Sequence, residues 1–281
     1  MSRGLGDVYK RQLLYPEEKT EYLQVSRRSL APAFLAVGEY ACVLAALPRQ
    51  RLTGAQLAAY CGTVCPEGEA ESVFDLKTPD TKALYAFLAK LPRPETADAV
   101  TGYLQSRPLR TGDILVDIGS GGTTQLLLEK LLGTELHGMQ LSADDRLRSR
   151  FSAARTEVFL FDGAPAPRIY WAGQPLLERL LSQDAGATLS YTKTPAGFRV
   201  NTATQPAEPL VAELQRGVLY FAQEWQKSVL NGQTIEPQRA ITPFLRLVES
   251  PTALQAKLLG DLTVEDGGIY PLAAPRSMGY Y

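Results

Sequence analysis

The middle of the chain alternates short apolar runs with segments that carry apolar residues at every third or fourth position. Residues 114–132 are the clearest example: an apolar run that ends at Asp117, a glycine-rich turn, and a leucine-rich segment with helical spacing. Further apolar runs of strand length cover residues 136–141 and 157–161. Strands that alternate with helices are typical of βαβ units. The pattern predicts an α/β fold with a Rossmann-like sheet and flanking helices.

The residues that precede this sheet have a mainly helical pattern from about residue 16 to residue 110. Apolar residues recur at three- and four-residue steps, and prolines separate the segments. The expected elements are a short strand over residues 22–25, a basic turn over 26–29, and helices over 30–47, 53–60 and 80–91.

The residues that follow the sheet are expected to form a hairpin and several helices. The expected elements are a helix over 175–182, a hairpin of residues 187–191 and 198–202 that turns at 195–197, a long helix over 208–229, and two shorter helices over 241–248 and 252–259. We expect a mainly helical segment over 13–110, the α/β domain with its C-terminal helices over 111–265, and an irregular tail over 266–281. Residues 1–12 resemble a leader read from non-genomic sequence, so we expect the chain to be a carboxyl-terminal piece of a longer protein.

Composition and charge exclude several classes of protein. The chain of 281 residues is 45% hydrophobic and 21% charged, which is ordinary for a globular protein. Its 29 lysines and arginines nearly balance its 30 aspartates and glutamates, so it lacks the positive field that binds nucleic acid or an anionic membrane. No apolar run reaches about 18 residues, and we therefore expect no membrane span.

The cysteines and the single histidine limit the redox and metal chemistry. Cys42, Cys61 and Cys65 are an odd number that does not suit a disulfide framework, which favours a reducing, cytoplasmic location. The chain has only two other cysteine or histidine residues, Cys42 and His137, that could join Cys61 and Cys65 in binding a metal ion. A metal site is not expected.

The glycine-rich turn is the candidate binding site. Its glycines permit positive φ and let backbone N–H groups approach a ligand, and the helix that follows presents its unpaired amides to an anion. Asp117, at the end of the strand, can accept hydrogen bonds from hydroxyl groups. Two arginines of the basic turn are candidate phosphate partners because of their fork geometry. The candidate residues are Asp117, Gly119, Ser120, Gly121, Gly122, Thr123, Thr124, Gln125, Arg27 and Arg28.

This arrangement resembles the first motif of S-adenosylmethionine-dependent methyltransferases, over residues 116–122. In that class the next strand ends in an acidic residue, whereas Gln140 stands at this place here. A methyltransferase is one alternative. The other alternative is a binding or scaffold domain without catalysis, in which the loop is only a tight connection.

A longer resemblance is to the carboxyl-terminal half of large haloacid dehalogenase-like proteins, which are associated with bacterial polysaccharide and glycosyltransferase functions. It rests on the order and spacing of short motifs at residues 22–30, 116–125, 175–181, 186–191, 214–221 and 251–252. The family commonly has Trp where Ser120 stands. The resemblance implies a domain that binds a phosphorylated or nucleotide-sugar ligand in glycan biosynthesis.

The resemblance does not by itself imply catalysis by this chain. Phosphoryl transfer in that family uses an Asp-x-Asp pair after a strand, but Asp117 is followed by Ile118 and Gly119, and Asp162 by Gly163 and Ala164. In the family, the complete catalytic set and its Mg²⁺ belong to an amino-terminal domain that this chain does not contain. That domain is therefore an expected partner, and whether this chain is an enzyme stays open.

Overall fold

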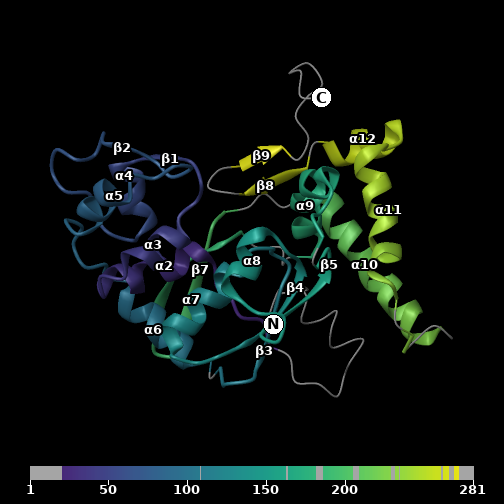
Figure 1. Cartoon of the computed structure of the whole chain (residues 1–281), viewed down its shortest axis with the longest axis horizontal. Helices are drawn as coiled ribbons and strands as arrows, with labels where there is room; N and C mark the ends of the chain where they lie inside the picture. Colours follow the sequence, from purple (N-terminus) through teal and green to yellow (C-terminus); the bar gives the residue numbers. More distant parts are fainter. Residues whose placement is uncertain are drawn as a thin grey trace.

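The structure is a computed structural model, and it describes residues 21–107, 109–162, 164–181, 186–204, 209–228, 232–233, 235–260, 262–265 and 269–271. The expected leader over residues 1–12 lies outside the described residues, as does most of the expected tail. The described part is a mixed α/β structure, as the sequence predicts (Figure 1).

Helices and one small two-stranded sheet make up the first part of the chain. They are α2 (Arg27–Ala36), α3 (Tyr40–Ala46), α4 (Gly54–Tyr60), α5 (Thr81–Leu88), α6 (Ala97–Gln105), and the antiparallel strands β1 (Arg51–Thr53) and β2 (Val73–Asp75). Ser26 caps α2, because its hydroxyl accepts the N–H of Ser29 and the Ser29 hydroxyl accepts the N–H of Ser26.

Several expectations for this part were wrong. Residues 22–25 form no strand. The helix expected over 30–47 is two helices, because Gly38 has a positive φ of 75° and ends the first one. The basic turn expected over 26–29 is the cap and first turn of α2. Helix α6 and the two-stranded β1–β2 sheet were not expected, since their apolar patterns are short.

A parallel three-stranded sheet forms the centre of the molecule. The elements are β3 (Ile114–Asp117), α7 (Thr123–Leu132), β4 (His137–Ser142), α8 (Asp145–Arg150) and β5 (Thr156–Leu160), with strand order β3-β4-β5. Helix α8 was not among the elements expected from the sequence. Asp144 caps this helix, because its carboxylate accepts the N–H groups of Arg146 and Leu147.

The last part of the chain contains the predicted hairpin and the C-terminal helices. The elements are α9 (Arg168–Leu181), β6 (Thr188–Thr194), β7 (Gly197–Thr202), α10 (Pro209–Lys227), α11 (Pro237–Glu249), α12 (Ala253–Gly260), β8 (Thr263–Glu265) and β9 (Ile269–Pro271). Helix α9 begins seven residues before its predicted start, and β9 lies in the segment expected to be irregular.

One hydrophobic core joins the helical part to the sheet and the hairpin. It contains Phe34 of α2, Leu128 of α7 and Tyr191 of β6, so it crosses the boundary expected at residue 110. Tyr191 stacks on Tyr103 of α6 with 4.2 Å between the ring centroids. Its hydroxyl donates to the carbonyl of Gln24 at 2.8 Å. The hairpin is thereby fixed to the helices, and α2 also contacts α7.

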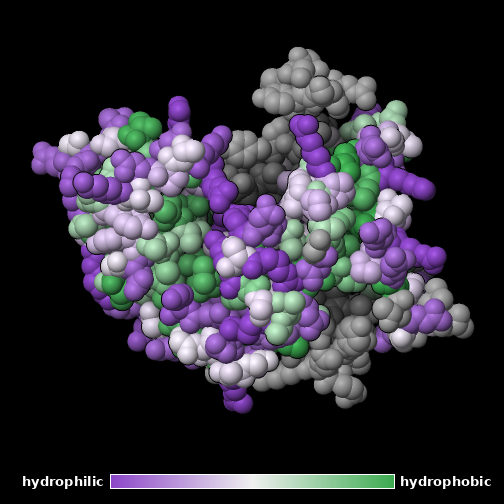
Figure 2. Space-filling view, viewed as in Figure 1, coloured by the Kyte–Doolittle hydropathy of each residue, from purple (hydrophilic) through white to green (hydrophobic). Residues whose placement is uncertain are grey.

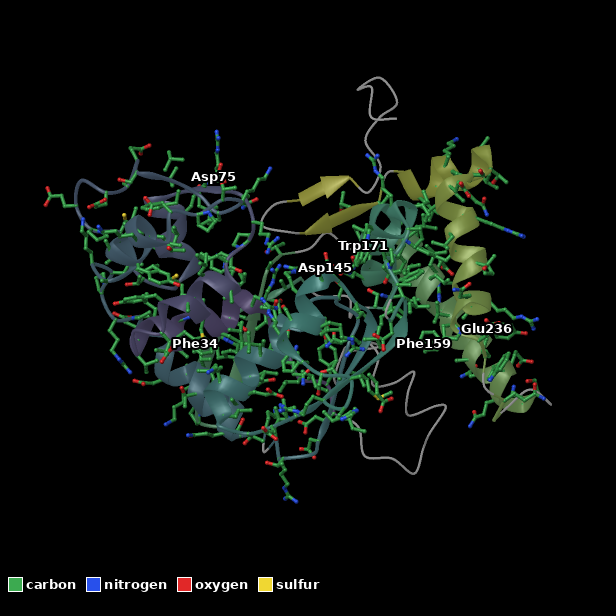
Figure 3. All side chains as sticks on the ribbon, viewed as in Figure 1. Phe34, Asp75, Asp145, Phe159, Trp171 and Glu236 are labelled. Carbon is green, nitrogen blue, oxygen red and sulfur yellow. The ribbon has the colours of Figure 1, made fainter. Side chains whose placement is uncertain are left out.

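The two faces of the parallel sheet differ. The face toward α7 and α8 carries buried residues such as Gly138, Gln140 and Thr156. The opposite face exposes Ile114 of β3 and Phe159 of β5. Figure 3 labels Phe159 on the far side of α8 from Phe34 of the helical core. No helix in the described part of the chain is long and apolar enough to cross a membrane.

Candidate functional site

The glycine-rich loop lies between the carboxyl end of β3 and the start of α7. Asp117 ends the strand, Thr123 begins the helix, and Gly122 caps it in the left-handed conformation with φ 62°. The carboxyl ends of parallel strands are where open α/β sheets bind ligands. The sequence therefore placed the loop correctly within the fold.

The second half of the loop is packed beneath α8. Gly121 and Gly122 are buried. A Cβ atom on Gly122 would lie 2.6 Å from Cδ1 of Leu147 and 3.0 Å from Cε2 of Phe151. A Cβ on Gly121 would lie 3.2 Å from the Arg146 guanidinium. The absence of side chains at these two positions therefore serves the close approach of α8.

The first half of the loop is more open, and Asp117 is its central group. Asp117 to Ser120 are partly exposed. Oδ1 of Asp117 accepts the N–H of Gly119 at 2.8 Å. Burial of the carboxylate raises the pKa of Asp117, and the Gly119 N–H and the positive charge of Arg27 oppose this increase.

Arg27 and Arg28 have different surroundings. Arg27 interacts electrostatically with Asp117, although about ninety residues separate them in the sequence. The guanidinium of Arg28 lies over the ring of Tyr60, 5.4 Å from its centroid. Only Arg27 of the two predicted phosphate partners is placed beside the loop.

The amino terminus of α7 has unused hydrogen-bond donors. The first amide of the helix with a backbone acceptor is that of Leu126, which donates to the carbonyl of Gly122 at 3.0 Å. Among the described residues, the N–H groups of Thr123, Thr124 and Gln125 have no acceptor. Amides of this kind and the positive end of the helix dipole favour an anion.

Arg150 of α8 was not predicted as a site residue, yet it contacts the loop directly. Its Nη1 donates to the carbonyl of Gly121 and to Oγ1 of Thr123, both at 2.7 Å. Desolvation lowers the pKa of Arg150, and the positive charges of Arg146 and Arg49 lower it further, while Asp144 raises it. The sequence offered one signal for this site residue. Arg146 and Arg150 follow the capping residue Asp144 and are four residues apart, which places them on the same face of a helix.

The structure corrects the role expected for Gln125. Its side chain is fully buried. The amide nitrogen donates to the carbonyl of Leu136 and to Glu129, both at 3.2 Å, and the amide oxygen accepts the hydroxyl of Thr156 at 3.1 Å. The side chain holds α7 onto the sheet and cannot reach a ligand without losing these bonds.

Gln140 shows the opposite situation. It is 2% exposed, it stands beside Asp117 in the β3–β4 register, and neither of its amide atoms has a hydrogen-bond partner in the part of the chain that the structure describes. A buried amide without a hydrogen bond is costly. Its place next to Asp117 makes it a further polar group at the carboxyl end of the sheet.

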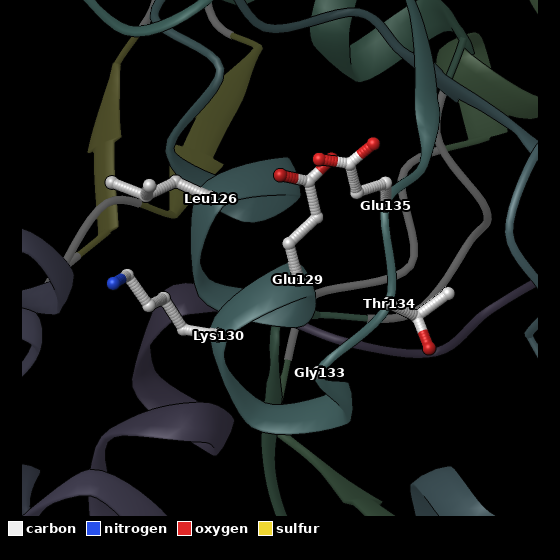
Figure 4. Close-up of a pocket in the computed structure, with 6 residues that line it drawn as sticks. All are labelled: Leu126, Glu129, Lys130, Gly133, Thr134 and Glu135. Atoms are coloured by element: carbon white, nitrogen blue, oxygen red, sulfur yellow. The ribbon is translucent and has the colours of Figure 1, made fainter.

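Two cavities lie along α7 toward its carboxyl end, away from Gly121 and Gly122. The larger has about 190 Å³ and is lined by Leu126, Glu129, Lys130, Gly133, Thr134 and Glu135. The carboxylates of Glu129 and Glu135 lie side by side there (Figure 4), and Arg155 pairs with both, at 2.7 and 3.1 Å. These side chains connect α7 to the start of β5, so their pairing has a structural explanation.

Asp162 and Cys61 could carry other chemistry, but Asp162 is paired with an arginine and the Cys61 thiol is buried. Asp162 accepts Nε of Arg148 at 2.9 Å. Burial raises the pKa of the Cys61 thiol to about 12. In the described ranges, no cluster of three or more histidine, cysteine, aspartate or glutamate side chains could hold a metal ion.

Comparison with protein-family models gives no match, and comparison with curated proteins gives none either.

Proposed function

We propose that the loop of residues 117–124 binds the phosphorylated part of a small hydroxyl-bearing ligand of nucleotide-sugar type. The observation that carries this proposal is Arg150: a partly buried guanidinium at the amino terminus of α7 whose hydrogen-bond partners, among the described residues, are neutral oxygens. A phosphate there would accept from the helix amides and from the remaining donors of Arg150. Asp117 would accept hydrogen bonds from ligand hydroxyl groups.

We propose further that the chain acts as the carboxyl-terminal domain of a cytoplasmic haloacid dehalogenase-like protein in bacterial glycan biosynthesis. In this proposal the chain binds the ligand, and the Asp-x-Asp pair and its Mg²⁺ belong to an amino-terminal partner domain. Two observations support a binding role: Asp117 has neither a second carboxylate two residues on nor a metal-binding cluster beside it, and Asp162 is paired with Arg148.

The test is a calorimetric titration of the full chain with uridine diphosphate glucose. Ser120 is partly exposed and its side chain has no hydrogen bond among the described residues, so Ser120→Asp places a negative charge at the loop with little effect on the fold. Ser250→Asp is the matched control, because Ser250 is exposed, has no side-chain hydrogen bond among the described residues, and lies at the end of α11.

We expect Ser120→Asp to weaken binding about tenfold, which is a loss of about 1.4 kcal/mol and within the range of a repulsive pair of charges near a protein surface. Ser250→Asp should bind as the unaltered chain does. Equal affinities for the two variants would mean that the ligand does not bind at this loop.

A methyltransferase remains the second candidate because of one observation. Gln140, two residues before the end of β4, stands beside Asp117, and its buried amide has no partner among the described residues; in that class a polar side chain near this place binds the ribose of the cofactor. Titration with S-adenosylmethionine separates the two candidates, and binding in the micromolar range would replace the first proposal with the second. Binding of neither probe would favour a scaffold domain.

A further inference from the structure

Gln140 of β4 is a buried side chain whose hydrogen-bonding capacity the fold leaves unused. Neither Oε1 nor Nε2 has a partner in the part of the chain that the structure describes. An amide in this state costs free energy in the folded protein. Asp117, its neighbour in the strand register, could accept from Nε2 only, so Oε1 would stay unpaired. A ligand that satisfies both atoms must offer a donor and an acceptor close together.

Gln140 lies in front of the amino terminus of α7. Gly138, two residues earlier on the same face of β4, is covered by Gln125 of α7, because a Cβ on Gly138 would stand 2.2 Å from Oε1 of Gln125. Gln140 is about 6.6 Å further toward the carboxyl end of the sheet. Helix α7 extends in this direction only to Thr123, which is about 3 Å. The amide of Gln140 is therefore placed beyond the helix end, beside the N–H groups of the first turn that have no acceptor among the described residues.

Asp117 adds a second polar side chain at this place. It lies opposite Gln140 on the neighbouring strand, and adjacent strands are about 4.8 Å apart. An ionised carboxylate only accepts hydrogen bonds, whereas the amide of Gln140 both donates and accepts. Two hydroxyl groups on neighbouring carbon atoms can satisfy this pair, because each hydroxyl donates one hydrogen bond and can accept others.

Two buried hydroxyl groups further along do not carry the same implication. Ser142 and Tyr170 are fully buried without a hydrogen bond among the described residues. Ser142 stands opposite Leu160 in the β4–β5 register, and Tyr170 belongs to the same core cluster as Leu160. Burial raises the pKa of Tyr170, and the Ser142 hydroxyl opposes this increase. The two hydroxyls can satisfy each other after a small rotation, so they need no ligand.

We propose that Gln140 and Asp117 bind the 2- and 3-hydroxyl groups of a hexose whose anomeric phosphate lies at the amino terminus of α7. This inference rests on the proposed function and adds to it a specificity-determining residue, Gln140, and the part of the sugar that it recognises. One hydroxyl donates to Oε1 of Gln140, and its neighbour accepts from Nε2 and donates to Asp117. Both hydroxyls lie close to the phosphate-bearing carbon, as the position of Gln140 beside the helix amides requires.

The hexose reaches Gln140 through the first half of the glycine-rich loop. Gln140 is buried, so residues 118–120 must move outward to admit the diol. This half of the loop is partly exposed, and the N–H of Asp144 donates to the carbonyl of Ser120 at 3.0 Å, which joins it to the start of α8. Figure 2 shows hydrophilic side chains over α8 and toward the helical part, so a polar ligand would approach over a hydrophilic surface.

The first experiment compares three nucleotide sugars on the full chain by competition calorimetry. They are uridine diphosphate glucose, its analogue without the 2-hydroxyl of the glucose, and its analogue without the 2′-hydroxyl of the ribose. We expect removal of the glucose hydroxyl to weaken binding at least about tenfold, because buried polar atoms of the site then lose their partner. Removal of the ribose hydroxyl should leave the affinity unchanged.

Gln140→Met tests the residue itself, because methionine has a similar volume and no atom that needs a strong hydrogen bond. We expect this variant to reduce the affinity ratio of the first two nucleotide sugars to about threefold or less, since only the bond to Asp117 remains. The midpoint of its urea denaturation should stay the same or rise. A lower midpoint would show that the amide is bonded within the fold, and the inference would be wrong.

Gln215→Met is the matched control. Gln215 of α10 is also a buried glutamine, and its amide donates to the carbonyl of Arg179 at 3.4 Å. This variant should be less stable, because that carbonyl loses its donor. It should nevertheless keep the full affinity ratio. If Gln140→Met and Gln215→Met show the same ratio, Gln140 does not recognise the sugar.

The outcomes separate this inference from the proposed function. If uridine diphosphate glucose binds at the loop and both deoxy analogues bind equally well, the inference is wrong and the proposed function stands. The same conclusion follows if the ribose analogue, and not the glucose analogue, is the weaker ligand. If uridine diphosphate glucose does not bind at all, the proposed function is wrong and the inference falls with it.

Discussion

The two glycines at the ends of α7 allow the packing role of the loop to be measured. Gly122 and Gly133 both have φ 62°, so alanine at either position must adopt the left-handed conformation. That strain costs about 1–2 kcal/mol. No atom lies within 4 Å of a Cβ at Gly133, whereas a Cβ at Gly122 would meet Leu147 at 2.6 Å. Overpacking of this kind adds about 1–3 kcal/mol.

We therefore expect Gly122→Ala to lower the free energy of unfolding by about 1–3 kcal/mol more than Gly133→Ala does. Urea denaturation followed by circular dichroism gives both values, provided that the m-value is the same for both variants. Because the strain is common to the two variants, the difference between them reports only the contact with α8. Equal losses of stability would mean that α8 does not pack on the loop as described.

Two further predictions concern buried polar groups. Tyr191→Phe should lower the free energy of unfolding by about 1–3 kcal/mol, because the partly buried carbonyl of Gln24 loses its donor and the buried hydroxyl of Ser29 loses its partner. Tyr85→Phe, whose hydroxyl has no partner in the described residues, should change the free energy of unfolding by much less in the same denaturation assay. Asp117→Asn should raise the unfolding free energy at pH 7, because a carboxyl whose pKa is raised on folding destabilises the fold when ionised. This gain should disappear as the pH falls below about 4, the ordinary pKa of an aspartate, and a gain that grew with acidity would contradict the assigned direction.

The sequence predicted those elements that local patterns determine. The strand that ends at Asp117, the turn, and the start of α7 follow from an apolar run, closely spaced glycines and threonines. The hairpin was predicted because Pro195, Ala196 and Gly197 separate two alternating segments. In each case the signal lies within a few residues of the structure it specifies.

The surroundings of the loop could not be predicted in this way, because they come from distant parts of the chain. Arg27 interacts electrostatically with Asp117 in a fold in which α2 contacts α7. Arg150 was not predicted as a site residue, because its contact with Gly121 forms only when α8 folds onto the loop. Gln125 was misassigned because a polar residue near a glycine turn was expected to face a ligand, whereas its place three residues before Leu128 puts it on the buried stripe of α7.

The balance between packing and charge decides how the loop is best interpreted. A connection that only joined β3 to α7 would need Gly121 and Gly122, since α8 covers both of them. It would not need a partly buried cation at the position of Arg150, because an apolar side chain there would pack without the cost of desolvating a charge. The glycines are explained by the fold, and the guanidinium of Arg150 is the feature that calls for a bound anion.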